Sequence, residues 1–160
     1  MKYIPLSRGM KAIVDDEDYE RFASFKWYAA TSEGRLFYAA RHSPRNHYAR
    51  YTILMHREIL GLSREDKRKG DHRDGNTLDN RRHNLRIADN IQNAQNSSIQ
   101  SNNTSGLKGV DWVRKAGKWR AKIYVAGKSK HLGLFTDKEA AGEAYRKAAL
   151  SYYGEFARIQ

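Results

Sequence analysis

The chain has 160 residues, and its 30 lysines and arginines against 18 acids give a formal net charge of +12, which is typical of proteins that neutralise a polyanion such as nucleic acid. It contains no cysteine, so disulfides, thiolate nucleophiles and Cys-ligated zinc are excluded, and any metal ion must be held by oxygen and imidazole. No signal peptide or apolar run approaching the roughly 20 residues of a membrane span is evident, so we expect a cytoplasmic, intracellular protein with no membrane partner.

The first 55 residues predict a β-rich N-terminal region. Short apolar runs alternate with turn signals, which favours strands. One segment differs, because Tyr19, Phe22 and Phe25 recur at helical spacing after a run of acids, which predicts a helix over residues 15–25. Ser-Pro-Arg-Asn at 43–46 predicts a loop. The expected strands are residues 3–6, 11–14, 26–30, 36–41 and 50–55.

Residues 56–96 form a second, more polar region. A helical turn is expected at residues 55–60, Asp74-Gly75-Asn76 is a strong turn signal, and residues 90–95 can form a polar helix. Residues 97–106 contain almost nothing that could be buried, so we interpret them as a flexible linker.

The region 107–160 predicts a three-stranded antiparallel sheet packed on one helix. Strands are expected at 110–113, 118–125 and 129–135, joined by tight turns. Thr136 and Glu139 have the spacing of a capping box, which predicts that the helix begins at Thr136, and Gly154 follows its end. Twelve of the thirty basic residues lie here against five acids, so positive charge is concentrated in this region.

The middle region contains a compound motif. Asp71-His72 precedes the turn at Gly75, a run Asp79-Asn80-Arg81, then Asn84-Leu85-Arg86, and finally Asn93. In order and spacing, this segment of about forty residues resembles the HNH endonuclease family. The resemblance implies a ββα-metal (His-Me finger) fold, in which a β-hairpin carries Asp71 and His72 and a helix carries Asn93.

The resemblance also implies roles for four catalytic residues. His72 would be the general base, because an imidazole suits deprotonation of water near neutral pH. Asp71 and Asn93 would hold one divalent metal ion, and their oxygen atoms favour Mg²⁺ or Mn²⁺. Asn84 matches the family's middle asparagine, so we expect its side chain to hydrogen-bond main chain near His72.

Several polar residues of this region also have simpler interpretations. Asp71 could be an exposed turn residue, and Asn93 a polar residue on a helix surface. His56 is as compatible with packing or with bracing the hairpin as with a role near phosphate, so it stays outside the catalytic set. We expect Arg81 and Arg82 to contact phosphate rather than to act as ion-pair partners.

The region 107–159 resembles the ethylene-responsive-factor (AP2) type of DNA-binding domain. Gly109-Val110, residues 117–121, residues 131–135 and Glu139-Ala140-Ala141 carry the resemblance. It implies a sheet that lies in the major groove with a helix behind it. Strand alternation divides the faces in the same way, because Trp119 and Ala121 share one face and Arg120 and Lys122 the other. The expected DNA contacts are Lys108, Arg114, Lys118, Arg120, Lys122, Tyr124 and His131.

This chain departs from the plant pattern at three positions. Asp111 and Val113 stand where plant members usually have arginines, and Ser129 replaces another. The GC-rich target of that family does not carry over, because Arg to guanine is the commonest specific contact. Trp112 is equally compatible with packing and with DNA contact.

Together the regions predict an α+β protein that resembles phage or intron-encoded homing endonucleases. We expect a metal-dependent endonuclease or nickase that acts on double-stranded DNA, with no obligate protein partner evident. The main alternative is a non-catalytic DNA-binding regulator that retains the nuclease fold. An RNA-binding protein is a third interpretation, which charge alone favours.

Overall fold

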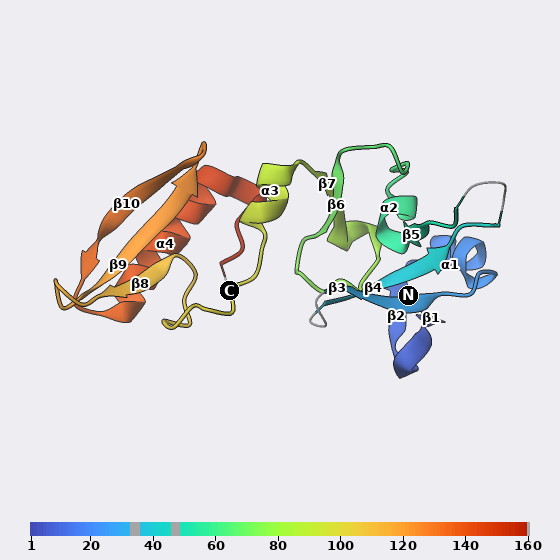
Figure 1. Cartoon of the computed structure of the whole chain (residues 1–160), viewed down its shortest axis with the longest axis horizontal. Helices are drawn as coiled ribbons and strands as arrows, with labels where there is room; N and C mark the ends of the chain where they lie inside the picture. Colours follow the sequence, from blue (N-terminus) through green and yellow to red (C-terminus); the bar gives the residue numbers. More distant parts are fainter. Residues whose placement is uncertain (33–35, 46–48, 160) are drawn as a thin grey trace. The chain divides into compact units, whose positions relative to one another are not determined.

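A computed structural model describes residues 1–32, 36–45 and 49–159. They form two compact units, Met1–Asn93 and Ala94–Gln160, which we call unit 1 and unit 2 and describe separately. In Figure 1 the chain of unit 1 runs from blue to yellow-green, and that of unit 2 continues to red. We expected boundaries after residues 55, 96 and 106, whereas the structure divides the chain once, after residue 93.

Unit 1 begins with a β-ribbon and a short helix. Strands β1 (Lys2–Pro5) and β2 (Lys11–Val14) pair antiparallel, and the 3-10 turn η1 (Ser7–Gly9) joins them. Helix α1 (Asp16–Ala23) follows directly, with three acids in its first turn, where the helix dipole favours negative charge. The helix is shorter than the expected range 15–25.

A three-stranded sheet and a second short helix complete the N-terminal half of unit 1. Strands β3 (Tyr28–Ser32), β4 (Leu36–His42) and β5 (Thr52–Leu54) are antiparallel in the order β3-β4-β5. Helix α2 (Met55–Ile59) continues from β5. Of the loop expected at 43–46, Asn46 lies outside the described residues.

The remainder of unit 1 is a strand pair with a long connection. Strand β6 (Lys69–His72) pairs antiparallel with β7 (Leu85–Ala88), the 3-10 turn η2 (Arg82–Asn84) precedes β7, and α3 (Asn90–Gln95) follows it. The connection is attached to β2, because the main-chain N–H of Asn80 donates to the carbonyl of Ile13 at 2.8 Å.

One hydrophobic core joins the two halves of unit 1. Ile4 and Phe22 come from the N-terminal ribbon and helix, Met55 from α2, and Leu85 from β7, and all belong to one cluster of buried side chains. The β-rich region and the motif region therefore fold as one unit, because neither half encloses this core alone.

Unit 2 is a sheet packed on a helix. Strands β8 (Val110–Val113), β9 (Lys118–Val125) and β10 (Lys128–Phe135) are antiparallel in the order β10-β9-β8, and α4 (Lys138–Tyr153) packs along them (Figure 1). Asp137, and not the expected Thr136, caps α4, because its carboxylate accepts a hydrogen bond from the N–H of Ala140 at 2.7 Å. The 3-10 turn η3 (Gly154–Phe156) follows the helix.

The segment 97–106, which we expected to be a flexible linker, is held within unit 2. Ser105 is buried, and its hydroxyl donates to the carbonyl of Val110 at 2.8 Å. The ammonium group of Lys108 donates to the carbonyls of Gln95 and Ser97, each at 2.7 Å. Composition indicates a flexible linker because few of these side chains are apolar, but polar side chains fix this segment through hydrogen bonds to the main chain.

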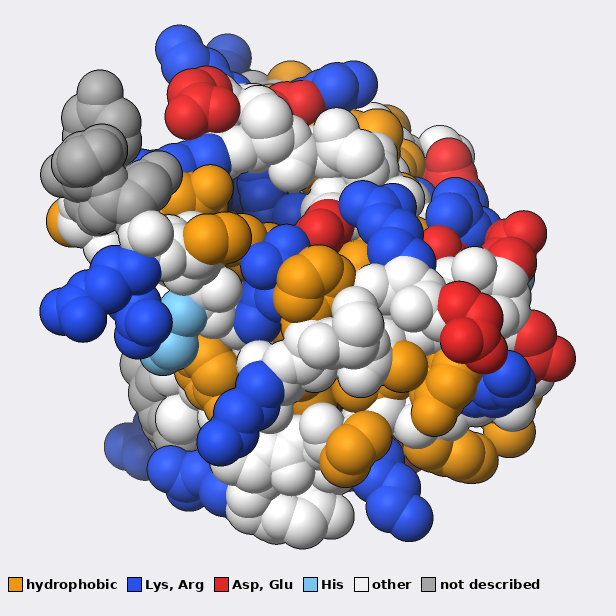
Figure 2. Space-filling model, turned by 90° about the vertical axis from the view of Figure 1, so that its right-hand side faces the viewer, with side chains coloured by type: hydrophobic (Ala, Val, Ile, Leu, Met, Phe, Trp, Pro, Cys, Tyr) orange, Lys and Arg blue, Asp and Glu red, His pale blue; other side chains and the backbone are white. Residues whose placement is uncertain are grey.

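Charge is unevenly spread over unit 1. Seen from the right-hand side of Figure 1, lysine and arginine side chains are scattered over the visible surface, and acidic side chains are most numerous toward the right of the view (Figure 2). Within the described residues, no helix is long and apolar enough to cross a membrane.

Candidate active site and candidate nucleic-acid interface

Asp71 and His72 lie at the end of β6, opposite Arg86 and Leu85 of β7. Both side chains are buried, at 7% and 4% exposure. The Nε of Arg86, itself buried, donates to Oδ2 of Asp71 at 2.8 Å. The simpler interpretation of Asp71 as an exposed turn residue is therefore wrong. Asp71 is a buried carboxylate that is paired with Arg86.

His72 belongs to a group of three rings, Tyr38 of β4, His56 of α2 and His72 of β6, which we call the His-Tyr cluster. The imidazoles of His56 and His72 meet edge to face, with centroids 4.9 Å apart. The ring of Tyr38 lies 5.7 Å from that of His56 and 6.2 Å from that of His72. Two other elements, β4 and α2, thus bring rings beside the candidate base on β6.

Gly70 allows His56 to approach β6 this closely. A Cβ atom at Gly70 would lie 2.5 Å from Cδ2 of His56, a distance at which something must shift. His56 is itself only 4% exposed, so its ring has little room to move. The absence of a side chain at position 70 therefore leaves the space that the ring of His56 occupies beside β6.

Burial keeps the imidazoles neutral. It lowers the pKa of His72, although the Asn80 side chain and the charges of Asp71, Asp74 and Asp79 act in the opposite direction. For His56, burial and then the charges of His72 and Arg57 lower the pKa to about 3. A neutral imidazole at physiological pH can accept a proton, which is the state that a general base requires.

Asn84 fixes the chain just after His72. Its Oδ1 accepts a hydrogen bond from the main-chain N–H of Asp74 at 3.1 Å, and its Nδ2 donates to the carbonyl of Asp79 at 2.9 Å. The side-chain bond that we expected from Asn84 to main chain near His72 is therefore present. The side chain of Asn84, just before β7, thus holds the main chain of the β6–β7 connection at Asp74 and at Asp79.

Asn93 is placed differently from the other three motif residues. It lies exposed on α3, a helix with no buried residue among its six. The structure thus brings Asp71, His72 and Asn84 together in the interior of unit 1, and leaves Asn93 on a surface helix.

The acidic group at the start of α1 is an ion-pair network. Asp15, Glu17 and Asp18 have carboxylate oxygens within 4.8 Å of one another. The guanidinium of Arg82 bonds to Asp18 at 2.7 Å and to Glu17 at 3.1 Å. The guanidinium of Arg82 already occupies oxygens of Asp18 and Glu17, and its main-chain N–H donates to Asp15, so we assign no metal ion to this group.

The expectation that Arg81 and Arg82 would not act as ion-pair partners is wrong. Arg81 pairs with Asp79 at 2.5 Å, and Arg82 with Asp18 and Glu17. The Asp18 partner of Arg82 was not visible in the sequence because it lies 64 residues away. Asp79 lies only two residues from Arg81, so that pair could have been found.

Unit 2 carries a basic face on its sheet. Successive outward positions of β9 place Lys118, Arg120, Lys122 and Tyr124 on one side, because alternate residues of a strand share a face. His131 of β10 lies opposite Lys122. Four of these side chains are exposed, and Arg120 is half-buried. Arg114, also exposed, lies in the turn between β8 and β9.

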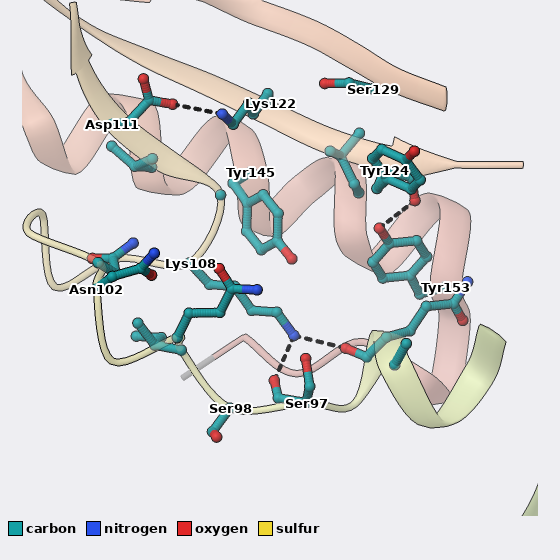
Figure 3. Close-up of a pocket in the computed structure, with 18 of the residues that line it drawn as sticks. Ser97, Ser98, Asn102, Lys108, Asp111, Lys122, Tyr124, Ser129, Tyr145 and Tyr153 are labelled. Atoms are coloured by element: carbon teal, nitrogen blue, oxygen red, sulfur yellow. Dashed lines mark hydrogen bonds and ion pairs between the residues drawn. The ribbon is translucent and has the colours of Figure 1, made fainter. Parts of the chain in front are cut away.

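Lys108 does not join this face. Its ammonium group lies in a pocket of about 470 Å³ and donates to two main-chain carbonyls (Figure 3). Burial, and then the charge of Arg158, lower its pKa to about 8. The assignment of Lys108 as a DNA contact is corrected: it anchors the residues before β8.

Sequence reasoning missed Tyr38, Asn80, Arg86 and Asp111 as members of these sites. Arg86 could have been found, because pairing the expected hairpin strands in register places it opposite Asp71. Tyr38 carried no signal beyond strand alternation, because its proximity to His72 depends on how β4 packs against β6.

Comparison with known proteins gives one family. No family model and no solved structure matches the chain. It is 34% identical over 90 residues to "Protein 3.8" of Escherichia phage T7, a match that covers 56% of this chain and 74% of the phage protein. The chain belongs to the family of this phage protein.

Plant proteins also match over a shorter stretch. The chain is 37% identical over 51 residues to "APETALA2-like protein 2" of Oryza sativa and to "AP2-like ethylene-responsive transcription factor TOE2" of Arabidopsis thaliana. Each match covers 32% of this chain, but only 12% of the rice protein and 10% of the Arabidopsis protein.

Proposed function

We propose that the protein is a metal-dependent endonuclease of the homing HNH type that hydrolyses, or nicks, a phosphodiester bond of duplex DNA. The observation that carries the proposal is the buried pair Asp71-His72 with its supporting rings and asparagine. A neutral imidazole beside a carboxylate, held from three elements, is suited to deprotonate a water molecule next to phosphate.

The available donors suit a hard divalent ion. Asp71 offers a buried carboxylate, Asn93 an amide oxygen, and the chain has no thiolate. Asp71 and Asn93 would hold Mg²⁺ or Mn²⁺, and such an ion supplies neutralisation of the charge that develops on the leaving oxygen. Arg86 orients the carboxylate of Asp71 through its bond at 2.8 Å.

The chain's own residues divide the remaining work. His72 accepts the proton of the attacking water. His56 and Tyr38 hold the His72 ring in place and exclude solvent from its sides, and Asn84 fixes the loop that follows it. Because the cluster is buried, the imidazole needs no prior deprotonation at neutral pH.

Unit 2 is proposed to bind the duplex and to select the site. Support comes from the basic face of its sheet and from the matches to plant proteins named for AP2, whose 51 matched residues are more than the β8–α4 segment, residues 110–153, contains. Lys118, Arg120, Lys122, Tyr124 and His131 would reach DNA, with Arg114 beside them. A nuclease centre that grips phosphate reads little sequence, so a second DNA-binding unit supplies selectivity.

The substitution His72→Ala tests the catalytic assignment. We expect magnesium-dependent cleavage to fall by about 10²- to 10⁴-fold, the usual loss when a general base is removed. DNA affinity, measured in chelator so that no cleavage occurs, should stay within about twofold, because a buried neutral ring adds little to phosphate binding. Undiminished cleavage by this variant would refute the assignment.

A second candidate function is a DNA-binding regulator without catalysis. The exposed position of Asn93 and the pairing of Asp71 with Arg86 favour it. The same assay separates the two functions: a regulator binds duplex DNA but leaves it intact with either metal, for the wild type and for His72→Ala alike.

A further inference from the structure

An acid lies on the basic face of unit 2. Asp111 of β8 is opposite Arg120 of β9 in the strand register. Its Oδ2 accepts from Nη2 of Arg120 at 2.7 Å, and its Oδ1 lies 3.3 Å from Nε of the same side chain. Oδ1 also lies 3.2 Å from Nζ of Lys122, the ion pair drawn in Figure 3. One carboxylate thus joins two cations of the proposed DNA-binding face.

This arrangement contributes little to folding. The three side chains retain 35%, 39% and 46% of their exposure, and exposed ion pairs add little to the stability of a fold. Burial alone would raise the pKa of Asp111, but bonds from Arg120 and Lys122 outweigh it and the pKa is lowered. Asp111 therefore stays charged at neutral pH, although a negative charge on this face repels phosphate.

The geometry of Arg120 suggests what Asp111 provides in return. Asp111 engages the Nε and Nη2 side of the guanidinium. The other edge of the guanidinium, formed by Nη1 and the second hydrogen of Nη2, is not used by Asp111, and the bonds to Asp111 fix its direction. A guanidinium held in this way presents a fixed two-donor fork, which matches the O6 and N7 acceptors of guanine.

We infer that Asp111 is a specificity-determining residue that orients Arg120 for reading a base and opposes indiscriminate binding to phosphate. The inference rests on the proposed DNA-binding role of unit 2. Discrimination gains from both effects, because Asp111 strengthens the correct contact and penalises a duplex that offers phosphates alone. Asp111 is a positioning residue for Arg120. Lys122 holds the carboxylate of Asp111 through a second ion pair.

A charge-matched pair of variants in the full chain tests the inference. Asp111→Asn and Glu139→Gln each remove one negative charge, and Glu139 is 73% exposed on α4, the helix that packs on the opposite side of the sheet. Each protein is incubated in chelator with a pool of randomised duplexes, and the bound fraction is sequenced. Affinity for one arbitrary duplex is measured in parallel by fluorescence anisotropy at several salt concentrations.

We expect Asp111→Asn to bind the arbitrary duplex about threefold to tenfold more tightly, as one removed phosphate repulsion implies. Its enrichment for the preferred base should fall about tenfold, as for a lost bidentate contact. Arg120→Ala should lose preference at the same position and should lose no more when combined with Asp111→Asn. Glu139→Gln should change both quantities by less than about twofold, which separates the local effect from net charge.

The outcomes separate the inference from the proposed function. Equal selectivity of Asp111→Asn and Glu139→Gln overturns the inference and leaves DNA binding intact. So does a wild-type protein that binds duplexes without any base preference. If the wild type binds no duplex, both the DNA-binding role of unit 2 and the inference are refuted.

Discussion

Adding one methyl group at Gly70 probes the His-Tyr cluster through His56, against which Gly70 lies. In Gly70→Ala the new Cβ would lie 2.5 Å from Cδ2 of His56 and 3.1 Å from Cδ1 of Leu60. His56 cannot withdraw freely, because its ring packs against those of Tyr38 and His72. The ring of His72 must therefore shift together with that of His56.

The magnitude follows from packing and from the tolerance of catalytic geometry. Overpacking a filled interior costs about 1–3 kcal/mol of unfolding free energy. Displacing a reacting group by up to 1 Å costs as much as about 10²-fold in rate. We expect Gly70→Ala to lower the unfolding free energy by about 1–3 kcal/mol. Magnesium-dependent cleavage should fall by about 10- to 100-fold.

Two comparisons make this prediction specific. Gly61→Ala meets no atom within 4 Å but has a φ of +68°, so it should cost about 1–2 kcal/mol through the backbone alone and leave cleavage unchanged. In a His56→Ala background, Gly70→Ala should lose most of its effect. Urea denaturation and single-turnover cleavage measure both quantities. Equal cleavage by the Gly70 and Gly61 variants would refute the reasoning.

Three further predictions follow. Unfolded His56 binds a proton below pH 6.5, but in the folded protein its pKa is about 3. Urea denaturation should therefore show stability falling as pH drops through this window, with His56 contributing up to about 1.4 kcal/mol per pH unit, and His56→Gln should reduce that slope but not abolish it, because burial also lowers the pKa of His72. Asp71→Ala should lose more magnesium-dependent cleavage than Asn93→Ala, because it removes a charge; equal losses would contradict this. Lys118→Gln should reduce the logarithmic salt dependence of DNA affinity by about 0.9, while exposed Lys147→Gln on α4 leaves it unchanged.

The sequence predicts most of the secondary structure of unit 2 because its signals are local. Alternation along residues 118–125 separates Ala121 and Ile123, which are buried, from Lys122 and Tyr124, which are exposed. The turns and the start of α4 are also encoded nearby, although Asp137 replaces Thr136 as the cap. Such features depend on residues a few positions apart.

Long-range pairing limits what the sequence reveals of the candidate sites. The motif indicates Asp71, His72 and Asn84, and the structure places them close together. It does not indicate that Tyr38 packs beside His72, because β4 and β6 are separated by 26 residues between Leu36–His42 and Lys69–His72. Arg82 was assigned to phosphate for the same reason, since its partner Asp18 is remote in sequence.

The segment 97–106 illustrates a different limit. Its polar composition is typical of linkers, and sequence patterns count the apolar side chains that could enter a core. Here Ser105 is buried through hydrogen bonds to main-chain carbonyls, and Lys108 holds the preceding residues in the same way. Polar groups that satisfy the main chain leave no periodic pattern to detect.

The central claim, that this protein hydrolyses DNA with a divalent ion, is tested most directly on supercoiled plasmid. Purified protein is incubated with plasmid in magnesium or manganese, and the nicked and linear products are separated over time, with parallel reactions in excess chelator. We predict nicked or linear product that depends on the metal and disappears in chelator. Supercoiled plasmid that remains intact with both metals, under conditions where the protein is shown to bind it, would contradict the claim.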